Sequence, residues 1–362
     1  MNRCKRCVMP DGRPDVPFDE DGVCQACRNY ENRPNIDWEA RHSELMALLD
    51  RHDGRCIVPS SGGKDSSYIS LRLKELGAEV TAVTAQTCYL TEIGRKNIDN
   101  LARHVRTIEV VPNQTVRAKL NRYGMELVGD ASWPQHASIW AIPFRMAIAL
   151  KTPLLIWGEN SQDQYGGPIG AESAKQMTHR WSAEFGGLNG LRPGDFVGSN
   201  GISKRDMEDY TFPTDADLAS VGVEAHFLGA YEQWDSWRNA EVAVANGLQT
   251  EMPCEANWWD FENLDCFFTA WHDAAMYRKF GYGRGCAQIS VDIRSGRCDR
   301  KEALEWVSVH DGVFPETYMG ITTEDGLERL GMTRDELTAT LDNFTNWDIF
   351  YKVSGGVALK SC

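Results

Sequence analysis

The sequence contains no apolar run of about 18 residues, the length that a helix needs to cross a membrane. Its N-terminal segment, Met1–Cys7, also lacks the apolar core of a signal peptide. No internal repeat or low-complexity segment interrupts the 362 residues. We therefore expect a globular protein in the cytoplasm, with no insertion into a membrane.

Positive charge is also scarce. The chain has 38 lysines and arginines against 52 aspartates and glutamates, which gives a formal net charge of −14. A surface that binds nucleic acid needs a net or local excess of positive charge to meet the phosphate backbone. The composition therefore argues against a nucleic-acid partner.

The 11 cysteines are an odd number, and four of them form two Cys-x-x-Cys pairs, Cys4 with Cys7 and Cys24 with Cys27. In a cytoplasmic chain this pattern indicates a metal site before disulfides. Two residues between thiolates let each pair bind one side of a tetrahedral Zn²⁺, and four sulfur ligands leave no open position. We expect structural zinc, with an iron–sulfur centre or four unrelated thiols as the alternatives.

The segment Ser60–Ser67 is glycine-rich and lies between a predicted strand at 56–59 and a predicted helix at 65–76. Two glycines at such a junction let backbone N–H groups approach an anion at the start of the helix. Lysine and serine side chains add donors, and Asp65 can hold a Mg²⁺ that bridges phosphate oxygens. The spacing is not that of a Walker loop. The expected phosphate contacts are Ser61, Gly62, Gly63, Lys64, Asp65 and Ser66; a glycine turn with a serine cap is the alternative.

Strands and helices alternate from residue 56 onward. The apolar pattern predicts strands at 56–59, 80–84, 108–111 and 154–157, and helices at 65–76, 92–105, 115–128 and 137–150. Repeated units of this kind predict an α/β fold with a doubly wound parallel sheet, whose ligands bind at the carboxyl ends of the strands. This rule places Thr84 and Gly158 near the glycine-rich loop.

Two further stretches carry candidate contacts for a substrate. The run Gly158–Gly167 offers a carboxylate, amides, a phenol and glycines, which suit a ligand rich in hydroxyl and amide groups. Its candidate contacts are Glu159, Asn160, Tyr165 and Gly166, and a polar loop that caps the next helix is the alternative. Arg284 and Arg294 lie among glycines near the C-terminal end and could clamp a phosphate, with surface ion pairing as the alternative. The tryptophans between 234 and 271 are expected to be core.

Together these motifs resemble the N-acetyl sugar amidotransferase family of the PP-loop ATP pyrophosphatases, found in surface-polysaccharide and nonulosonic-acid pathways. The resemblance covers nearly the whole chain. It rests on the two cysteine pairs with their flanks, Asn35–Trp38, Ser61–Ser66, 158–160 with 165–167, Lys279–Arg284 and Asp292–Arg297. The glycine-rich loop alone is specific only for the superfamily, which includes GMP synthetase, asparagine synthetase and tRNA thiolases.

The resemblance implies a reaction that converts the acetamido group of a sugar, expected to be nucleotide-linked, into an acetamidino group. ATP and ammonia would be consumed, and AMP and pyrophosphate released. The implied fold is of the PP-loop type, with Mg²⁺ and Zn²⁺ as cofactors. The residues implied as catalytic are Lys64, Asp65 and Glu159; Thr84 and Gly158 would join the loop in binding ATP, and Arg284 and Arg294 would bind the substrate diphosphate.

The chain is expected to have three parts. Residues 1–50 would form the zinc knuckle and a connecting helix, and 51–222 the ATP-binding domain with a long substrate loop. Residues 223–362 would complete the substrate site as a mainly helical region that ends in two capped helices. No stretch resembles a glutaminase, so the resemblance implies ammonia from a separate class I glutaminase subunit and leaves room for a cyclase-like partner.

Two other functions compete with this one. In a sulfur-inserting protein of the tRNA-thiolase kind, one cysteine would carry a persulfide; the candidates are Cys88, Cys254, Cys266, Cys286 and Cys298. The negative net charge and the absence of a basic run argue against it. A non-catalytic nucleotide-binding adaptor would use the zinc knuckle for docking, and the complete Ser61–Ser66 motif argues against that.

Overall fold

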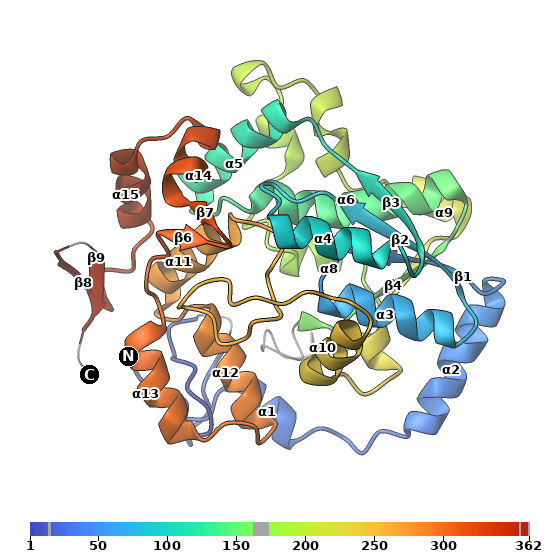
Figure 1. The fold of residues 1–362 in the computed structure, drawn as a ribbon, viewed down its shortest axis with the longest axis horizontal. Helices are drawn as coiled ribbons and strands as arrows, with labels where there is room; N and C mark the ends of the chain where they lie inside the picture. The colour runs from blue at the N-terminus through green and yellow to red at the C-terminus, as the bar shows by residue number, and fades with distance from the viewer. Residues whose placement is uncertain (14–15, 162–173, 355, 361–362) are drawn as a thin grey trace.

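The protein is described by a computed structural model that covers residues 1–13, 16–161, 174–354 and 356–360. A five-stranded sheet with the order β3-β2-β1-β4-β5 forms its centre, and every neighbouring pair of strands is parallel (Figure 1). The strands are β1 (Arg55–Pro59), β2 (Glu79–Ala85), β3 (Arg106–Val110), β4 (Leu154–Trp157) and β5 (Glu224–Phe227). The predicted α/β class and parallel sheet are confirmed.

Helices cover both faces of the sheet. Successive side chains of β1 point to opposite faces: Cys56 and Val58 pack in one core with α3 (Lys64–Glu75), and Ile57 packs in another with α6 (Trp133–Leu150). The first core also contains side chains of α2 (Trp38–Arg51). Apolar cores on both faces explain why the strands read as nearly continuous apolar runs.

The remaining elements of the sheet region are helices that connect its strands. They are α4 (Glu92–Leu101), α5 (Gln114–Val128), and, between β4 and β5, α8 (His179–Phe185), the 3₁₀ helices η2 (Pro193–Phe196), η3 (Ser199–Gly201) and η4 (Arg205–Tyr210), and α9 (Asp215–Val221). Strand β5 pairs with β4, so the sheet takes its last strand from the part of the chain that begins at 223. No helix in the described ranges combines the length and apolarity needed to span a bilayer.

The C-terminal part is mainly helical, as predicted. After the short η5 (Leu228–Ala230) it contains α10 (Ser236–Ala245), α11 (Thr269–Phe280), α12 (Arg284–Arg294), α13 (Arg300–His310), α14 (Thr323–Leu330) and α15 (Arg334–Asn343), with a short pair of strands, β6 (Thr317–Tyr318) and β7 (Ile321–Thr322). Thr333 forms a capping box with Glu336 at the start of α15. The expectation that two capped helices end the chain is wrong, because β8 (Phe350–Val353) and β9 (Gly356–Leu359) form a hairpin after them.

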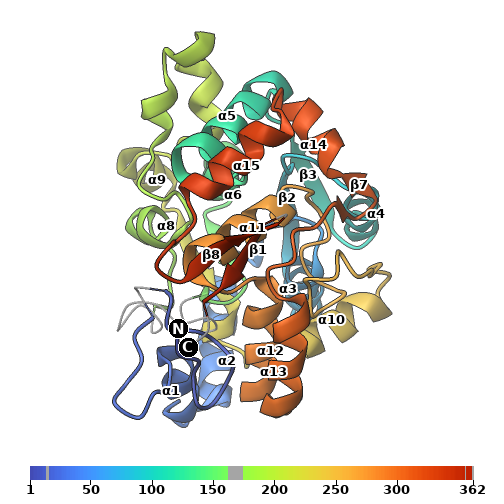
Figure 2. The ribbon, with the colours of Figure 1, turned by 90° about the vertical axis from the view of Figure 1, so that its left-hand side faces the viewer.

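The N-terminal cysteine segment packs against the C-terminal helices. Figures 1 and 2 both place the segment before α1 (Gln25–Glu31) beside α12 and α13. The four cysteines share a buried cluster with side chains such as Ile289 and Val307, and Arg300 donates hydrogen bonds to the carbonyls of Cys4 and Cys7. The N-terminal segment and helices α12 and α13 therefore stabilise one another.

Candidate nucleotide site and cysteine cluster

The glycine-rich loop connects β1 to α3 at the carboxyl end of the central strand. Gly62 has a φ of +80°, and a Cβ atom there would lie 2.8 Å from Ile98, so only glycine fits. The Gly62 N–H donates to Ser60 Oγ, and Gly63 is the residue before the first turn of α3. The loop thus directs the N-terminus of a twelve-residue helix at whatever ligand enters.

A cavity of about 430 Å³ opens in front of this loop, a size typical of small-molecule sites. One wall is the loop and the carboxyl ends of β1, β2, β4 and β5, as the fold rule predicts. The opposite wall comes from 261–265 and from Arg284 at the start of α12. The cavity therefore lies between the sheet and the C-terminal part.

Lys64 lies at the centre of a network of charged groups. It is 3% exposed, and its Nζ lies 2.5 Å from Asp65 Oδ2 and 2.9 Å from Glu262 Oε1. Gln288 of α12 donates to Glu262 Oε2 at 3.0 Å, and Asn239 of α10 donates to Asp65 Oδ1 at 3.2 Å. Burial disfavours charge on Glu262, but the Lys64 ammonium and the hydrogen bond from Gln288 together outweigh it and hold the pKa of Glu262 below its usual value. The network holds Lys64 and Asp65 in place through contacts that reach α10 and α12.

Two further carboxylates in the cavity have raised pKa values. Burial raises the pKa of Glu159 to about 7; the negative charges of Asp65 and Glu262 add to the shift, and Lys64 opposes it. Burial likewise raises the pKa of Asp265 to about 6, and its Oδ2 has no hydrogen-bond partner within the described part of the chain. Carboxylates thus dominate this cavity, and a triphosphate would be repelled unless a divalent cation accompanied it.

Because the pKa of Glu159 is raised, we expect the stability of the fold to depend on pH through this residue. A carboxyl group whose pKa rises on folding stabilises the fold most below its unfolded value near 4.5, and this contribution is lost as pH rises toward about 7. Glu159→Gln removes the buried charge, so the variant should gain up to about 3 kcal/mol over wild type at pH 8 and less than about 1 kcal/mol at pH 5. Thermal unfolding at both pH values measures this difference.

Glu92→Gln is the matched control for Glu159→Gln. Glu92 is exposed, and its hydrogen bond with Lys96 lowers its pKa. This substitution should therefore give no gain at high pH. If both variants showed the same change in stability between pH 5 and pH 8, the surroundings of Glu159 would not disfavour its charged form.

Aromatic side chains form the third part of the cavity wall. Trp140 of α6, Trp157 at the end of β4 and Trp181 of α8 all line it, with the rings of Trp140 and Trp157 4.7 Å apart. None of these three tryptophans was expected from the sequence to contact a ligand. Rings at the ends of neighbouring strands and helices provide a flat apolar surface on which a base or a sugar ring can stack.

Most of the predicted site residues meet in this cavity. Those that line it are Ser61, Gly62, Gly63, Lys64, Asp65, Ser66, Gly158, Glu159 and Arg284. Arg284 also forms an ion pair with Asp273 at 2.8 Å. Thr84 is fully buried within β2 and does not line the cavity, and neither does Asn160, which donates to the Ala174 carbonyl. Tyr165 and Gly166 lie outside the described residues.

The run Asp292–Arg297 has a structural role that the sequence analysis did not anticipate. Asp292 is buried and accepts hydrogen bonds from the indole N–H groups of Trp237, Trp258 and Trp259. Arg294 is not among the cavity-lining residues, and its charge lies near the Cys7 thiol. The run Asp292–Arg297 therefore contributes to the packing of the tryptophans and the cysteine segment.

The four cysteines of the N-terminal pairs come together as predicted. Their sulfur atoms all lie within 4.8 Å of one another, with Cys4 and Cys27 3.9 Å apart and Cys7 and Cys24 3.7 Å apart. A tetrahedral Zn²⁺ with Zn–S bonds of about 2.3 Å needs sulfurs about 3.8 Å apart. Hydrogen bonds with Cys24 and Cys27 lower the pKa of Cys7. The cluster fits an all-sulfur metal site.

These features define an α/β protein with a parallel sheet, a glycine-rich loop that faces a carboxylate-lined cavity, and a four-cysteine cluster. Residues 257–360 match the family model for "LPS biosynthesis protein WbpG-like, C-terminal domain". The match includes Glu262, Asp265 and Arg284, so the wall of the cavity opposite the loop belongs to a region similar to a domain of lipopolysaccharide biosynthesis. Comparison with curated proteins gives no significant match.

Proposed function

We propose that the protein is an ATP-dependent amidotransferase that converts the acetamido group of an N-acetylated sugar into an acetamidino group. The observation that carries the proposal is the shared cavity: the glycine-rich loop with Lys64 and Asp65 faces Glu159 across a single space. The similarity of residues 257–360 to a lipopolysaccharide biosynthesis domain supports a surface sugar as substrate.

The reaction has two steps. First, the acetamido oxygen attacks the α-phosphorus of ATP, the bond to the bridging oxygen breaks, and pyrophosphate leaves with the electron pair. Ammonia then attacks the imidate carbon and gives up a proton, and AMP departs with the former amide oxygen. Adenylation is needed because an amide oxygen is otherwise a poor leaving group.

The chain's own residues have distinct roles in this scheme. Backbone N–H groups at the start of α3 and the Lys64 ammonium would stabilise the charge that develops on pyrophosphate. Asp65 is the candidate ligand for Mg²⁺, which supplies charge neutralisation when bound. Glu159, with a pKa of about 7, can accept a proton from the attacking ammonia near neutral pH. Arg284 would bind a phosphate of the sugar nucleotide.

The position of the cysteines favours nitrogen over sulfur as the incoming atom. Within the described ranges, no cysteine lines the cavity. Cys88 is buried in an apolar cluster with Phe267 and Trp271, and burial raises the pKa of its thiol. A persulfide carrier has to reach the activated carbon as a thiolate, which this position does not allow. Ammonia would come from solution or from a separate glutaminase subunit.

Product analysis tests the proposed function. With Mg²⁺, ammonium and a panel of N-acetylated sugar nucleotides, ATP should give AMP and pyrophosphate in step with a sugar product about one mass unit lighter. Cys88→Ala should keep this activity within about tenfold. ADP and phosphate as the products, or a persulfide on Cys88 together with loss of activity in the variant, would contradict the proposal.

A further inference from the structure

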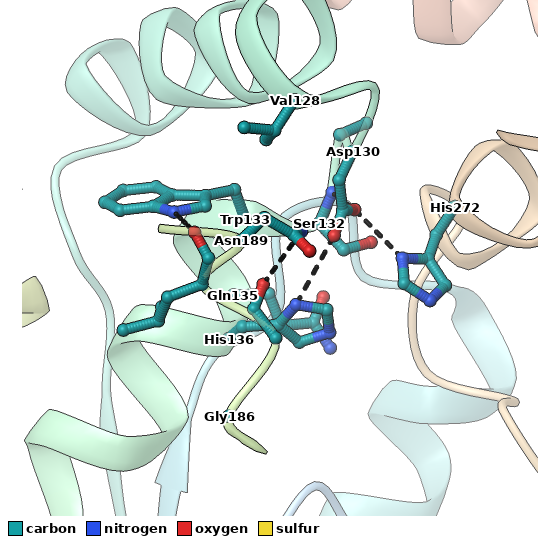
Figure 3. A network of polar contacts seen from close by, with 12 residues as sticks. Val128, Asp130, Ser132, Trp133, Gln135, His136, Gly186, Asn189 and His272 are labelled. Atoms are coloured by element: carbon teal, nitrogen blue, oxygen red, sulfur yellow. Dashed lines mark hydrogen bonds and ion pairs between the residues drawn. The ribbon is translucent and has the colours of Figure 1, made fainter. Parts of the chain in front are cut away.

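A cluster of two histidines and one carboxylate lies outside the residues that line the cavity and has no part in the proposed reaction. Figure 3 shows Asp130 between His136 and His272, whose imidazole rings both face the carboxylate. Asp130 lies in the turn between α5 and α6, His136 in the first turn of α6, and His272 in α11. The cluster therefore joins the start of α6 to α11, which lies far away in the sequence.

The side chains of this cluster lie close enough together to share one metal ion. His272 Nδ1 lies 2.9 Å from Asp130 Oδ1, and His136 Nδ1 lies 3.6 Å from Asp130 Oδ2. One ligand atom from each residue lies within 4.8 Å of the others. A divalent transition metal with bonds of about 2.0–2.2 Å to nitrogen and oxygen holds neighbouring ligand atoms about 3.3–3.5 Å apart. The His136 contact, at 3.6 Å, is close to this value, and the His272 contact, at 2.9 Å, is a hydrogen bond that a bound ion would replace.

Hydrogen bonding leaves one buried carboxylate oxygen of this cluster unsatisfied. Asp130 is 2% exposed, and its Oδ2 receives no hydrogen bond from any described residue. The contact with His136 at 3.6 Å is too long to be one. Asp130 Oδ1, in contrast, accepts from both His272 and the Ser132 backbone N–H. An unsatisfied buried oxygen is costly, and a cation between it and the imidazole would remove that cost.

A second histidine–carboxylate cluster in the same chain provides a contrast. Glu224 lies between His52 and His226, with contacts of 2.5 Å and 2.9 Å. Here Arg51 binds the carboxylate as well, and the other nitrogen of His226 is paired with the Tyr231 hydroxyl at 2.6 Å. The polar atoms of this second cluster are paired with other protein groups. We therefore interpret it as an ion-pair network and not as a metal site.

The position of the first cluster relates it to the substrate cavity. His136 precedes Trp140 by four residues on α6, so the two side chains lie on the same face, and Trp140 lines the cavity. Asp273, which follows His272, forms the ion pair with the cavity residue Arg284. Both imidazoles are about one quarter exposed. Three protein ligands would leave at least one coordination position of the metal open.

We propose that Asp130, His136 and His272 form a binding site for a divalent first-row transition metal, separate from the four-cysteine cluster. Two imidazoles and one carboxylate suit Zn²⁺ or Fe²⁺, with an open position for water or an oxygen of the substrate. The site does not depend on the proposed amidotransferase reaction, because metal binding is measured without substrate.

Metal content and Co²⁺ spectroscopy of the full-length protein test the site. Wild-type protein equilibrated with excess Co²⁺ and then desalted should carry two metal equivalents, one in the four-cysteine cluster and one at Asp130. The second equivalent should give visible bands of nitrogen and oxygen coordination, without the near-ultraviolet bands of sulfur-to-cobalt charge transfer. Elemental analysis of the protein as purified then distinguishes zinc from iron.

Substitutions assign the second equivalent. His272→Ala and Asp130→Asn should each lose it and keep the metal of the four-cysteine cluster, and retention of that metal shows that the variant is folded. His52→Gln, in the satisfied Glu224 cluster, is the matched control and should keep both equivalents. One equivalent in the wild type, or two in the His272 and Asp130 variants, would overturn the proposal.

Discussion

Asp65→Asn should lower the rate of AMP formation by about a thousandfold, which corresponds to about 4 kcal/mol of transition-state stabilisation. The substitution keeps the size of the side chain and its contact with Asn239, but it removes the negative charge that a Mg²⁺ on the phosphates would need. Lys64 keeps its second partner, Glu262, so the loop should stay in place. Initial rates with saturating ATP, ammonium and sugar nucleotide measure the effect.

Asp99→Asn is the matched control for Asp65→Asn. Asp99 lies on α4 in an exposed ion pair with Arg95, outside the cavity, and exposed pairs of this kind contribute little to stability. Its variant should have the wild-type rate. If Asp65→Asn were as active as Asp99→Asn, Asp65 would have no role in catalysis.

Cys24→Ser should cause the largest loss of stability, because it removes one sulfur of the four-cysteine cluster. Structural zinc sites contribute about 10–16 kcal/mol of binding free energy, and loss of one thiolate is expected to release the ion and lower the melting temperature by about 10 °C. The effect should extend to α12 and α13, because these helices pack against the cysteine segment. Elemental analysis and thermal unfolding measure both changes.

The control for Cys24→Ser is Cys298→Ser. Cys298 lies outside the cluster and is only partly buried, with its thiol directed at the Asp299 carbonyl. Its variant should keep the metal and the wild-type melting temperature to within about 2 °C, since partly exposed substitutions cost little. A Cys24→Ser protein that melts like Cys298→Ser would show that the cluster holds no structural ion.

The sequence predicts the sheet region well because its signals are local. The strand at 154–157 has its predicted bounds, and the helix predicted at 115–128 begins one residue earlier, at Gln114. The glycine-rich loop is recognisable because Gly62 has to adopt a positive φ between a strand and a helix. The cysteine cluster is equally predictable, since the spacing within each pair already brings two sulfurs together.

The opposite wall of the cavity could not be predicted, because it depends on tertiary packing. Glu262 and Asp265 lie in an irregular segment with no periodic pattern, and they become functional candidates only through their position opposite the loop. Arg284 and Arg294 look equivalent in sequence. They are ten residues apart on one helix, however, so they lie at its two ends, and only Arg284 reaches the cavity.

Transfer of a heavy-oxygen label tests the central claim most directly. The substrate is an N-acetylated sugar nucleotide labelled at the acetamido oxygen and incubated with ATP, Mg²⁺ and ammonium. If the amide oxygen is adenylated, the label has to leave with AMP, and mass spectrometry should find AMP about two mass units heavier in a one-to-one ratio with the amidine. Unlabelled AMP, or label retained in the sugar, would contradict the proposed function.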